Sequence, residues 1–214
     1  MNVSIIGSGN MARGIGTRLV ASGHSVTYFA RGVEKSNKLV QDLQQVAKLG
    51  AKVFAKGFGE PIIDGVVILA VPYGAMLQVT KAYRDQLPGK IVVDISNAID
   101  YQKMELLVPA GSSAAEEVSK LLPQDVKLVK AFNTVFAGTL VEGKVDGQPL
   151  DIYVASNNAE AKEVLKKLIA DGGMRSLDAG PLSHARYLEA MTVMLISVQA
   201  QINSRMTSAV KIIC

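Results

Sequence analysis

Short apolar, β-branched runs alternate with longer segments of helical periodicity along the chain. This alternation is typical of a parallel sheet covered by helices. The runs expected to form strands are residues 2–6, 25–29, 51–54, 65–71, 90–95, 126–132, 150–156 and 175–179. The segments expected to form helices are residues 11–22, 33–49, 73–85, 113–122 and 159–170. Strands such as "VVILAV" are continuously apolar, as strands covered on both faces are. The pattern predicts an α/β fold with a doubly wound, mostly parallel sheet.

The end of the chain follows a different pattern. Residues 182–206 form one mostly apolar segment with helical spacing, and the only candidate boundary before it lies near Gly180 and Pro181. We therefore expect a sheet domain over residues 1–180 and a small C-terminal helical extension over residues 181–214. Because an apolar helix needs cover, we expect a homodimer in which the extension contributes to the interface and to the substrate crevice.

Composition narrows the class of protein. The 214 residues are 49% hydrophobic and 20% charged, which allows a sizeable core. The net charge is +4, but the basic residues are scattered, so we expect no nucleic-acid partner. The single cysteine, Cys214, closes no intramolecular disulfide, and we find no metal-ligand spacing. No signal peptide or membrane-spanning segment is evident, so we expect a cytoplasmic protein without a membrane partner. Whether Cys214 is reactive stays open.

A glycine-rich turn follows the first predicted strand. Residues 7–12, "GSGNMA", match the G-x-G-x-x-A fingerprint at the junction of a strand and a helix. Gly7 permits the tight turn, Gly9 lets backbone N–H groups approach a pyrophosphate, and Ala12 lets helix and strand pack closely. The sequence therefore predicts a dinucleotide site that includes Gly7, Ser8, Gly9, Asn10 and Met11.

The acidic residue that usually binds the ribose of NAD is missing. No Asp or Glu occurs between Asn10 and Val33, and the second strand ends instead at Ala30 and Arg31, with Lys35 one turn into the next helix. A guanidinium and an ammonium suit a 2′-phosphate, which a carboxylate would repel. We expect NADP(H) rather than NAD(H), which makes residues 1–180 an NADP-binding Rossmann domain. The alternative is that Arg31 and Lys35 form a solvated face.

The other strand ends should converge beside this turn, because ligands of doubly wound sheets bind beyond the carboxyl ends of the strands. Ala70, Val71, Pro72 and Tyr73 are expected to wall the nicotinamide side, unless they form only a packed turn. Possible substrate contacts are Asn97, Asn133, Thr134 and His184, and Asn97 is also expected near the cofactor.

The predicted crevice lacks the groups of several reaction classes. We find no Ser/His/Asp set, and His24 is expected to be exposed and inert in a turn. Lys130 ends a strand, where a lysine is more often structural than catalytic. Dehydrogenases that act on hydroxy acids need a group to handle the alcohol proton, whereas transfer between two hydride carriers needs mainly two flat rings held in contact. No residue is assigned a certain catalytic role.

Five segments together carry a family resemblance: "GSGNMARGIGTRLVASGHSVTYFARG", "LAVPYGA", "KIVVDISNA", "SAAEEVSKLLPQDVKLVKAFNT" and "LDAGPLSHARYLEAMTVMLI". They resemble the NADPH-dependent coenzyme F420 reductases, and in part the oxidoreductase domain of six-transmembrane ferric reductases. The resemblance implies a Rossmann fold with a C-terminal extension, a dimer, and hydride transfer between NADP(H) and a deazaflavin. By position it places the cofactor loop on residues 8–11, the 2′-phosphate pocket on Ala30, Arg31 and Lys35, and the nicotinamide region on residues 70–72 and Ala131.

The acceptor stays open at this point. The chain departs from the archaeal F420 enzymes at "DISNA" and at Asn133, both near the expected acceptor site. An NADPH:flavin or ferric reductase, with FAD or FMN as second substrate, is one alternative, and a redox sensor that binds NADP(H) without turnover is another. In each case the expected partner is a small molecule that accepts or donates hydride.

Overall fold

The computed structural model describes residues 1–213, apart from the side chains of Val33 and Lys35. The main strands are β1 (Asn2–Ile6), β2 (Ser25–Ala30), β3 (Val53–Gly57), β4 (Val66–Leu69), β5 (Ile91–Asp94), β8 (Lys127–Lys130), β11 (Asp151–Ala155) and β12 (Arg175–Gly180). Two small hairpins pair β6 (Ile99–Asp100) with β7 (Glu105–Leu106) and β9 (Lys144–Val145) with β10 (Gln148–Pro149). The α-helices are α1 (Asn10–Ala21), α2 (Val33–Gln44), α3 (Tyr73–Tyr83), α4 (Ala114–Ser119), α5 (Ala137–Glu142), α6 (Ala159–Asp171) and α7 (Ala185–Val198). Short 3-10 helices cover Arg84–Gln86 and Leu182–His184.

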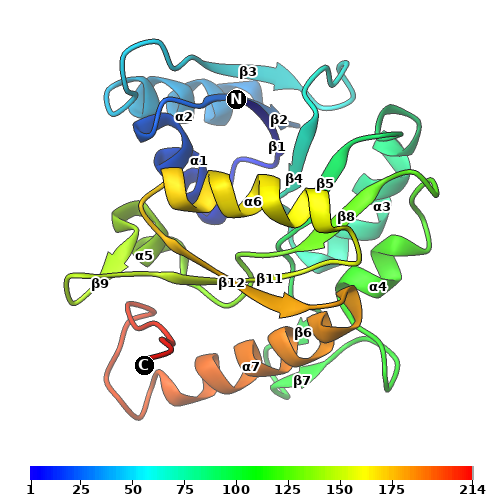
Figure 1. Cartoon of the computed structure of the whole chain (residues 1–214), viewed down its shortest axis with the longest axis vertical. Helices are drawn as coiled ribbons and strands as arrows, with labels where there is room; N and C mark the ends of the chain where they lie inside the picture. Colours follow the sequence, from blue (N-terminus) through cyan, green and yellow to red (C-terminus); the bar gives the residue numbers. More distant parts are fainter. Residues whose placement is uncertain (214) are drawn as a thin grey trace.

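The eight main strands form one sheet in the order β12-β11-β8-β5-β4-β1-β2-β3 (Figure 1). All neighbours pair in parallel except β8 and β11, which are antiparallel. Strand order reverses between β1 and β4, where the chain crosses from one half of the sheet to the other. The fold is a doubly wound Rossmann sheet, as predicted, and its ligand crevice is expected at this reversal.

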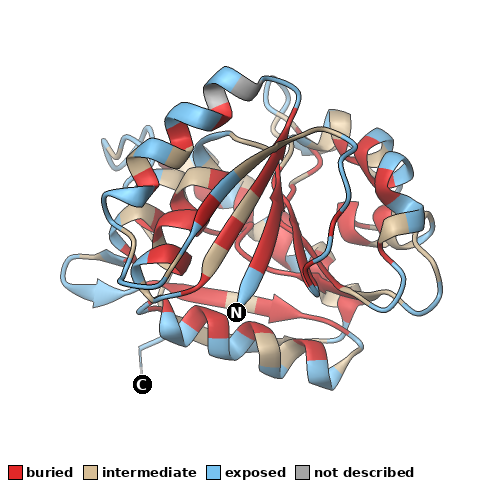
Figure 2. Cartoon of the chain, turned by 90° about the horizontal axis from the view of Figure 1, so that it is seen from above, coloured by how far each residue is buried: buried red, intermediate tan, exposed pale blue. Residues whose placement is uncertain are grey.

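Apolar side chains alternate between two cores, one on each face of the sheet. On β4, Val66 and Ile68 face the core that packs under α1, α2, α5 and α6, whereas Val67 and Leu69 face the core under α3 and α4. A strand covered on both faces cannot place polar residues on either, which explains the continuous apolar runs of the sequence. Figure 2 shows the buried strands between helices whose outer sides are exposed.

Helix α1 approaches its neighbours closely because its glycines leave room. A Cβ on Gly14 would lie 2.7 Å from Cβ of Leu140 in α5, and a Cβ on Gly16 would lie 1.7 Å from the Tyr28 hydroxyl. That hydroxyl donates to the Ala12 carbonyl at 3.0 Å, and Ala12 is fully buried. The small residue at the third fingerprint position therefore packs helix against strand, as expected.

Three predicted helices are markedly shorter in the structure, and one of them is α4, which covers Ala114–Ser119 of the predicted residues 113–122. Helix α2 ends at Gln44 rather than residue 49, because the chain turns away and the Lys48 N–H donates to the Val20 carbonyl at the end of α1. Helix α7 covers only Ala185–Val198 of the predicted residues 182–206. Beyond it, the Gln199 side chain is buried and donates to the Leu195 carbonyl, and Asn203 has a left-handed backbone with φ 52°. Helix α5 and both hairpins were not predicted.

The boundary predicted at residue 180 coincides with the end of β12, and the described residues beyond it form a 3-10 turn, α7 and a tail. The division into two domains stays a prediction. Among residues 1–213, no helix has both the length and the apolar character needed to cross a bilayer. Cys214 lies outside the described residues.

Candidate active site

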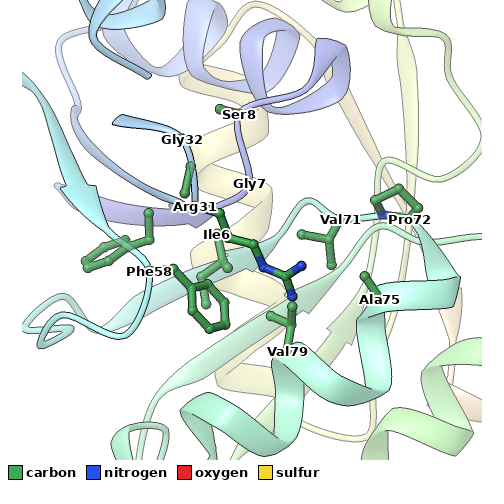
Figure 3. Close-up of a pocket in the computed structure, with 12 residues that line it drawn as sticks. Ile6, Gly7, Ser8, Arg31, Gly32, Phe58, Val71, Pro72, Ala75 and Val79 are labelled. Atoms are coloured by element: carbon green, nitrogen blue, oxygen red, sulfur yellow. The ribbon is translucent and has the colours of Figure 1, made fainter. Parts of the chain in front are cut away.

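Two cavities open at the reversal of strand order, and they share Val71 and Pro72. The first, called the Arg31 cavity, has a volume of about 270 Å³. Its lining residues are Ile6, Gly7, Ser8, Phe29, Ala30, Arg31, Gly32, Phe58, Val71, Pro72, Ala75 and Val79 (Figure 3). The second, called the Asn97 cavity, has a volume of about 380 Å³. Its lining residues are Gly9, Asn10, Met11, Ala70, Val71, Pro72, Tyr73, Gly74, Ile95, Ser96, Asn97, Ile99, Tyr101, Leu107 and Asn133. Together they form one crevice with two ends.

The Arg31 cavity carries a cation against an aromatic wall. The Arg31 guanidinium carbon lies 5.4 Å from the centre of the Phe58 ring, within the range of a cation–π contact. Figure 3 shows the Arg31 side chain extending between Phe58 and Val79. Phe58 is positioned from behind, because its ring makes an edge contact with Tyr83 at 5.1 Å and the Gly59 N–H donates to the Tyr83 hydroxyl at 2.7 Å. The guanidinium is therefore held at the end of β2, where a 2′-phosphate is expected.

The glycine turn joins the two cavities. Gly7 has φ 120°, and a Cβ there would lie 2.2 Å from the Ala70 carbonyl oxygen, so only glycine fits between β1 and the end of β4. Gly9 is different, because its backbone is extended (φ −81°) and no atom lies within 4 Å of a Cβ built there. The N-terminus of α1 has no side-chain cap. Its first N–H groups therefore have no side-chain acceptor, which is the condition for an anion site at a helix N-terminus.

Two asparagines close the floor of the Asn97 cavity. The Asn97 side-chain amide donates to the Asn133 carbonyl at 3.0 Å, and the Asn133 amide donates back to Oδ1 of Asn97 at 3.0 Å. The Thr192 hydroxyl of α7 also donates to the Asn133 carbonyl, at 3.1 Å. The pair therefore fixes the loop after β5 to the loop after β8 and to the last helix.

Two polar atoms on this floor have no hydrogen-bond partner within the described chain. They are Oγ of Ser96 and Oδ1 of Asn133, whose residues are only 5% and 3% exposed. A buried polar atom without a hydrogen bond is costly, so such atoms are usually satisfied by water or a ligand. Both residues line the Asn97 cavity, so the floor offers one hydroxyl, which can donate or accept, and one amide oxygen, which accepts.

An ion cluster lies beneath the same floor. The Lys130 ammonium contacts Asp94 at 2.9 Å and Glu189 at 2.7 Å, and all three side chains are 0% exposed. It also donates to the Ser96 carbonyl. Burial by itself lowers the pKa of Lys130, but the charges of Asp94 and Glu189 outweigh it and hold that pKa above its usual value. Lys130 is thus a fixed cation that orients the Ser96 loop, which supports the structural interpretation over the catalytic one.

No charged side chain of the described residues lines the Asn97 cavity. Burial, together with the negative charges of Glu117 and Glu189, raises the pKa of Tyr73, so the Tyr73 phenol stays neutral at physiological pH. The cavity can therefore hold a neutral flat ring, but it offers no cation for a carboxylate substrate.

Most of the predicted site residues gather in the crevice. Gly7, Ser8, Ala30 and Arg31 line the Arg31 cavity, whereas residues 9–11, Ala70, Tyr73, Asn97 and Asn133 line the Asn97 cavity, with Val71 and Pro72 in both. Ala131 and Thr134 are buried nearby but are not among the lining residues. The Lys35 side chain lies outside the described residues. These residues stay proposals as ligand contacts.

The histidines are placed differently from the asparagines. His184 is not among the lining residues; its Nδ1 lies 2.6 Å from the Ala179 carbonyl oxygen, and its ring packs on Tyr187 at 5.2 Å. The prediction that His24 is exposed was wrong. His24 is 6% exposed, because its ring lies between the N-terminal ammonium of Met1, 2.9 Å from Nδ1, and Asp171 of α6, 3.0 Å from Nε2. No local pattern indicates Asp171 as the partner of His24, because the two residues are 147 positions apart in the chain.

Phe58, Tyr101 and Leu107 line the crevice but were not predicted. Phe58 follows the third strand of the first half of the sheet, so the strand-end rule could have found it. Tyr101 and Leu107 belong to the β6–β7 hairpin, which has no Asn-Gly turn signal and leaves no comparable clue.

Comparison with known proteins agrees with this geometry. The family model "NADP oxidoreductase coenzyme F420-dependent" matches residues 2–98. The F420-dependent NADP reductase of Methanocaldococcus jannaschii is 32% identical over 97% of this chain and 96% of its own length. The chain belongs to the F420-dependent NADP reductase family. This family membership confirms the predicted resemblance and the predicted class, an NADP-dependent oxidoreductase.

A second group of relatives of this F420-dependent NADP reductase family member consists of longer proteins. Metalloreductase STEAP3 of Rattus norvegicus is 32% identical over 91% of this chain, but the chain spans only 37% of that protein.

The crystal structure of an Arthrobacter sp. FB24 protein, assigned as an F420-dependent NADP-reductase, superposes with a TM-score of 0.82 at 24% identity, and the match covers 99% of both chains. That structural similarity confirms the predicted fold.

Proposed function

We propose that this chain transfers hydride between NADP(H) and a deazaflavin or flavin acceptor, as an F420-dependent NADP reductase does. The observation that carries the proposal is the division of the crevice. One end holds a guanidinium and adjoins the glycine turn, whereas the other is uncharged and partly apolar, and both meet at Val71 and Pro72. Such a crevice suits a phosphorylated dinucleotide at one end and a flat ring at the other.

The residues present fit NADP(H). The open space at Gly9 and the uncapped start of α1 suit the pyrophosphate, and Arg31 supplies a cation for the 2′-phosphate. Ala70, Pro72 and Tyr73 would flank the nicotinamide. NADPH, when bound, supplies the hydride; the chain's own part is to hold that ring against a second one and to exclude water.

The lack of charge in the Asn97 cavity supports a ring acceptor over a hydroxy acid. A hydroxy-acid dehydrogenase needs a proton-handling group beside the substrate and a cation for its carboxylate. Lys130, which donates to the Ser96 carbonyl beneath this cavity, is buried and already bonded to two carboxylates. A ring-to-ring transfer requires neither group.

A flavin or ferric reductase is the second candidate. It is favoured by the identity of 32% to Metalloreductase STEAP3, which spans most of this chain. In that case FAD or FMN, rather than coenzyme F420, would occupy the Asn97 cavity.

A homodimer and a cytoplasmic location are also part of the proposal. Helix α7 supports the dimer, because its outward face exposes Tyr187 (68%) and Met194 (56%), two large side chains about two helical turns apart. A second copy of the chain would cover them. The oligomeric state can be measured by light scattering.

The proposal is tested by anaerobic NADPH oxidation, with coenzyme F420, FAD and FMN supplied side by side to the purified protein. Turnover with F420 supports the leading function, and turnover with a flavin alone selects the second candidate. If the protein binds NADPH tightly but oxidises it with none of the three, it is a binding module and both enzymatic proposals fail.

A further inference from the structure

We propose that the β6–β7 hairpin is the acceptor-recognition wall of the crevice, with Tyr101 and Leu107 packing against the flat tricyclic ring that deazaflavins and flavins share. This inference rests on the proposed function and names the residues that select its second substrate. It concerns residues outside the nucleotide-binding turn.

The hairpin is fixed in place by its own hydrogen bonds. Ile99 pairs with Leu106 and Asp100 with Glu105, and the Leu107 N–H donates to the Ala98 carbonyl at 2.7 Å. The Asp100 carboxylate accepts from the N–H groups of Gln102 and Lys103 at 2.9 and 3.1 Å. A turn closed in this way places the neighbouring Tyr101 in a defined position without a glycine. Figure 1 shows the hairpin beside α7, which β7 contacts.

The two side chains at the ends of this hairpin are large, apolar and uncovered. Tyr101 is 67% exposed and Leu107 is 59% exposed, yet both line the Asn97 cavity. Ile95 and Ile99 continue the apolar lining inward. Side chains that are exposed at the mouth of a cavity and continuous with its apolar interior are suited to stack on a ring that enters it.

The floor opposite this wall supplies the polar part of the site. Oγ of Ser96 and Oδ1 of Asn133 are buried acceptor atoms without partners in the described chain. The pyrimidine portion of the tricyclic ring carries an N–H group in both deazaflavins and flavins, which such acceptors would bind. The absence of charged lining among the described residues restricts recognition to this neutral ring, so the charged tail of either acceptor would lie outside the cavity.

The test compares Tyr101→Ala and Tyr101→Phe with the wild type. Binding of oxidised F420 and of FMN to the protein loaded with NADP⁺ is measured by fluorescence titration, and the acceptor KM is measured by anaerobic NADPH oxidation. We expect Tyr101→Ala to weaken binding of the acceptor that the wild type uses by about tenfold, and Tyr101→Phe to stay within about twofold. The Kd of NADPH should be unchanged in both. Leu107→Ala should also raise the Kd and the KM of that acceptor.

Phe54→Ala is the matched control, because Phe54 is an aromatic side chain 51% exposed on β3 that lines neither cavity of the crevice. It should leave the acceptor KM unchanged. The inference would be overturned if Tyr101→Ala left the acceptor Kd and KM unchanged, or if it weakened NADPH binding as much as acceptor binding. Failure of the wild type to use any acceptor would instead overturn the proposed function, so the two failures are distinct.

Discussion

The Nζ atom of Lys130 lies 2.7 Å from Oε1 of Glu189, and neither side chain is exposed to solvent. The contact ties the end of β8 to α7. Glu189 also accepts from the Ala114 N–H at the start of α4, at 2.9 Å, and Lys130 donates to the Ser96 carbonyl on the floor of the Asn97 cavity. One buried cation thus joins the last helix to the floor on which the acceptor is proposed to bind.

Removal of this cation should destabilise the fold strongly. Lys130→Met leaves Asp94 and Glu189 facing each other without a positive charge, so we expect the free energy of unfolding to fall by about 3–5 kcal/mol. Lys127→Met is the control on the same strand. Lys127 makes an ion pair of 2.7 Å with Glu160, which is 70% exposed, and its loss should cost less than about 1 kcal/mol. Urea unfolding that shows equal losses for the two variants would contradict the account.

Gly9→Ala should separate cofactor binding from stability. No atom lies within 4 Å of a Cβ at Gly9, and its φ of −81° suits alanine, so the melting temperature should hardly change. NADPH binding should weaken by about tenfold, because the methyl group enters the space proposed for the pyrophosphate. Gly138→Ala, which also meets nothing within 4 Å but lies in α5, should leave the NADPH Kd unaltered. Wild-type affinity in Gly9→Ala would place the pyrophosphate elsewhere.

Arg31→Ala should distinguish the two nicotinamide cofactors. A charge-assisted hydrogen bond contributes about 1.5–3 kcal/mol, so NADPH binding should weaken by about ten- to a hundredfold while NADH binding hardly changes. Both constants can be measured by cofactor fluorescence on the same preparation. Equal weakening of NADPH and NADH would show that Arg31 acts through the shape of the cavity rather than through the 2′-phosphate.

Asp151 should make the fold sensitive to acid. Burial by itself would raise its pKa, but hydrogen bonds from Arg175, the Ile212 N–H and Lys211 outweigh burial and lower the pKa to about 2. Because the folded pKa lies below the unfolded value, the stabilisation is present above about pH 4 and is lost as pH falls toward 2. Between about pH 6 and pH 2, the wild type should lose about 2 kcal/mol more unfolding free energy than Asp151→Asn.

Asp85→Asn is the control for this acid sensitivity, because the Asp85 side chain is 95% exposed. Its acid profile should follow that of the wild type. If Asp151→Asn also follows the wild-type profile, the contacts between Asp151 and the C-terminal tail contribute nothing to acid stability.

The sequence predicted the sheet well because its strands are covered on both faces. Val66–Leu69 and residues 91–93 are buried on both sides, which leaves a clear apolar run, and the charged Asp94 at the end of β5 is paired with Lys130. The length of α7 was overestimated because apolar periodicity continues past Val198, whereas the buried Gln199 side chain and the left-handed Asn203 end the helix. Such side-chain contacts have no periodic signature.

The candidate site was predictable only where a short motif describes it. The glycine turn and Arg31 lie within one βαβ unit, so local spacing placed them together. The Lys130 cluster joins residues 36 and 59 positions apart in the chain, and the hairpin that carries Tyr101 closes through an aspartate side chain. Contacts across such distances depend on the assembled sheet, and so does the burial of His24.

Hydride is proposed to pass directly between two rings held in one crevice. The most direct test is a single anaerobic turnover with F420 and NADPH carrying deuterium at C4 of the nicotinamide, each epimer in turn. With direct transfer, one epimer should slow NADPH oxidation and deliver its deuterium to the reduced deazaflavin, while the other should do neither. Reduced acceptor that carries only solvent hydrogen with both epimers would contradict direct transfer.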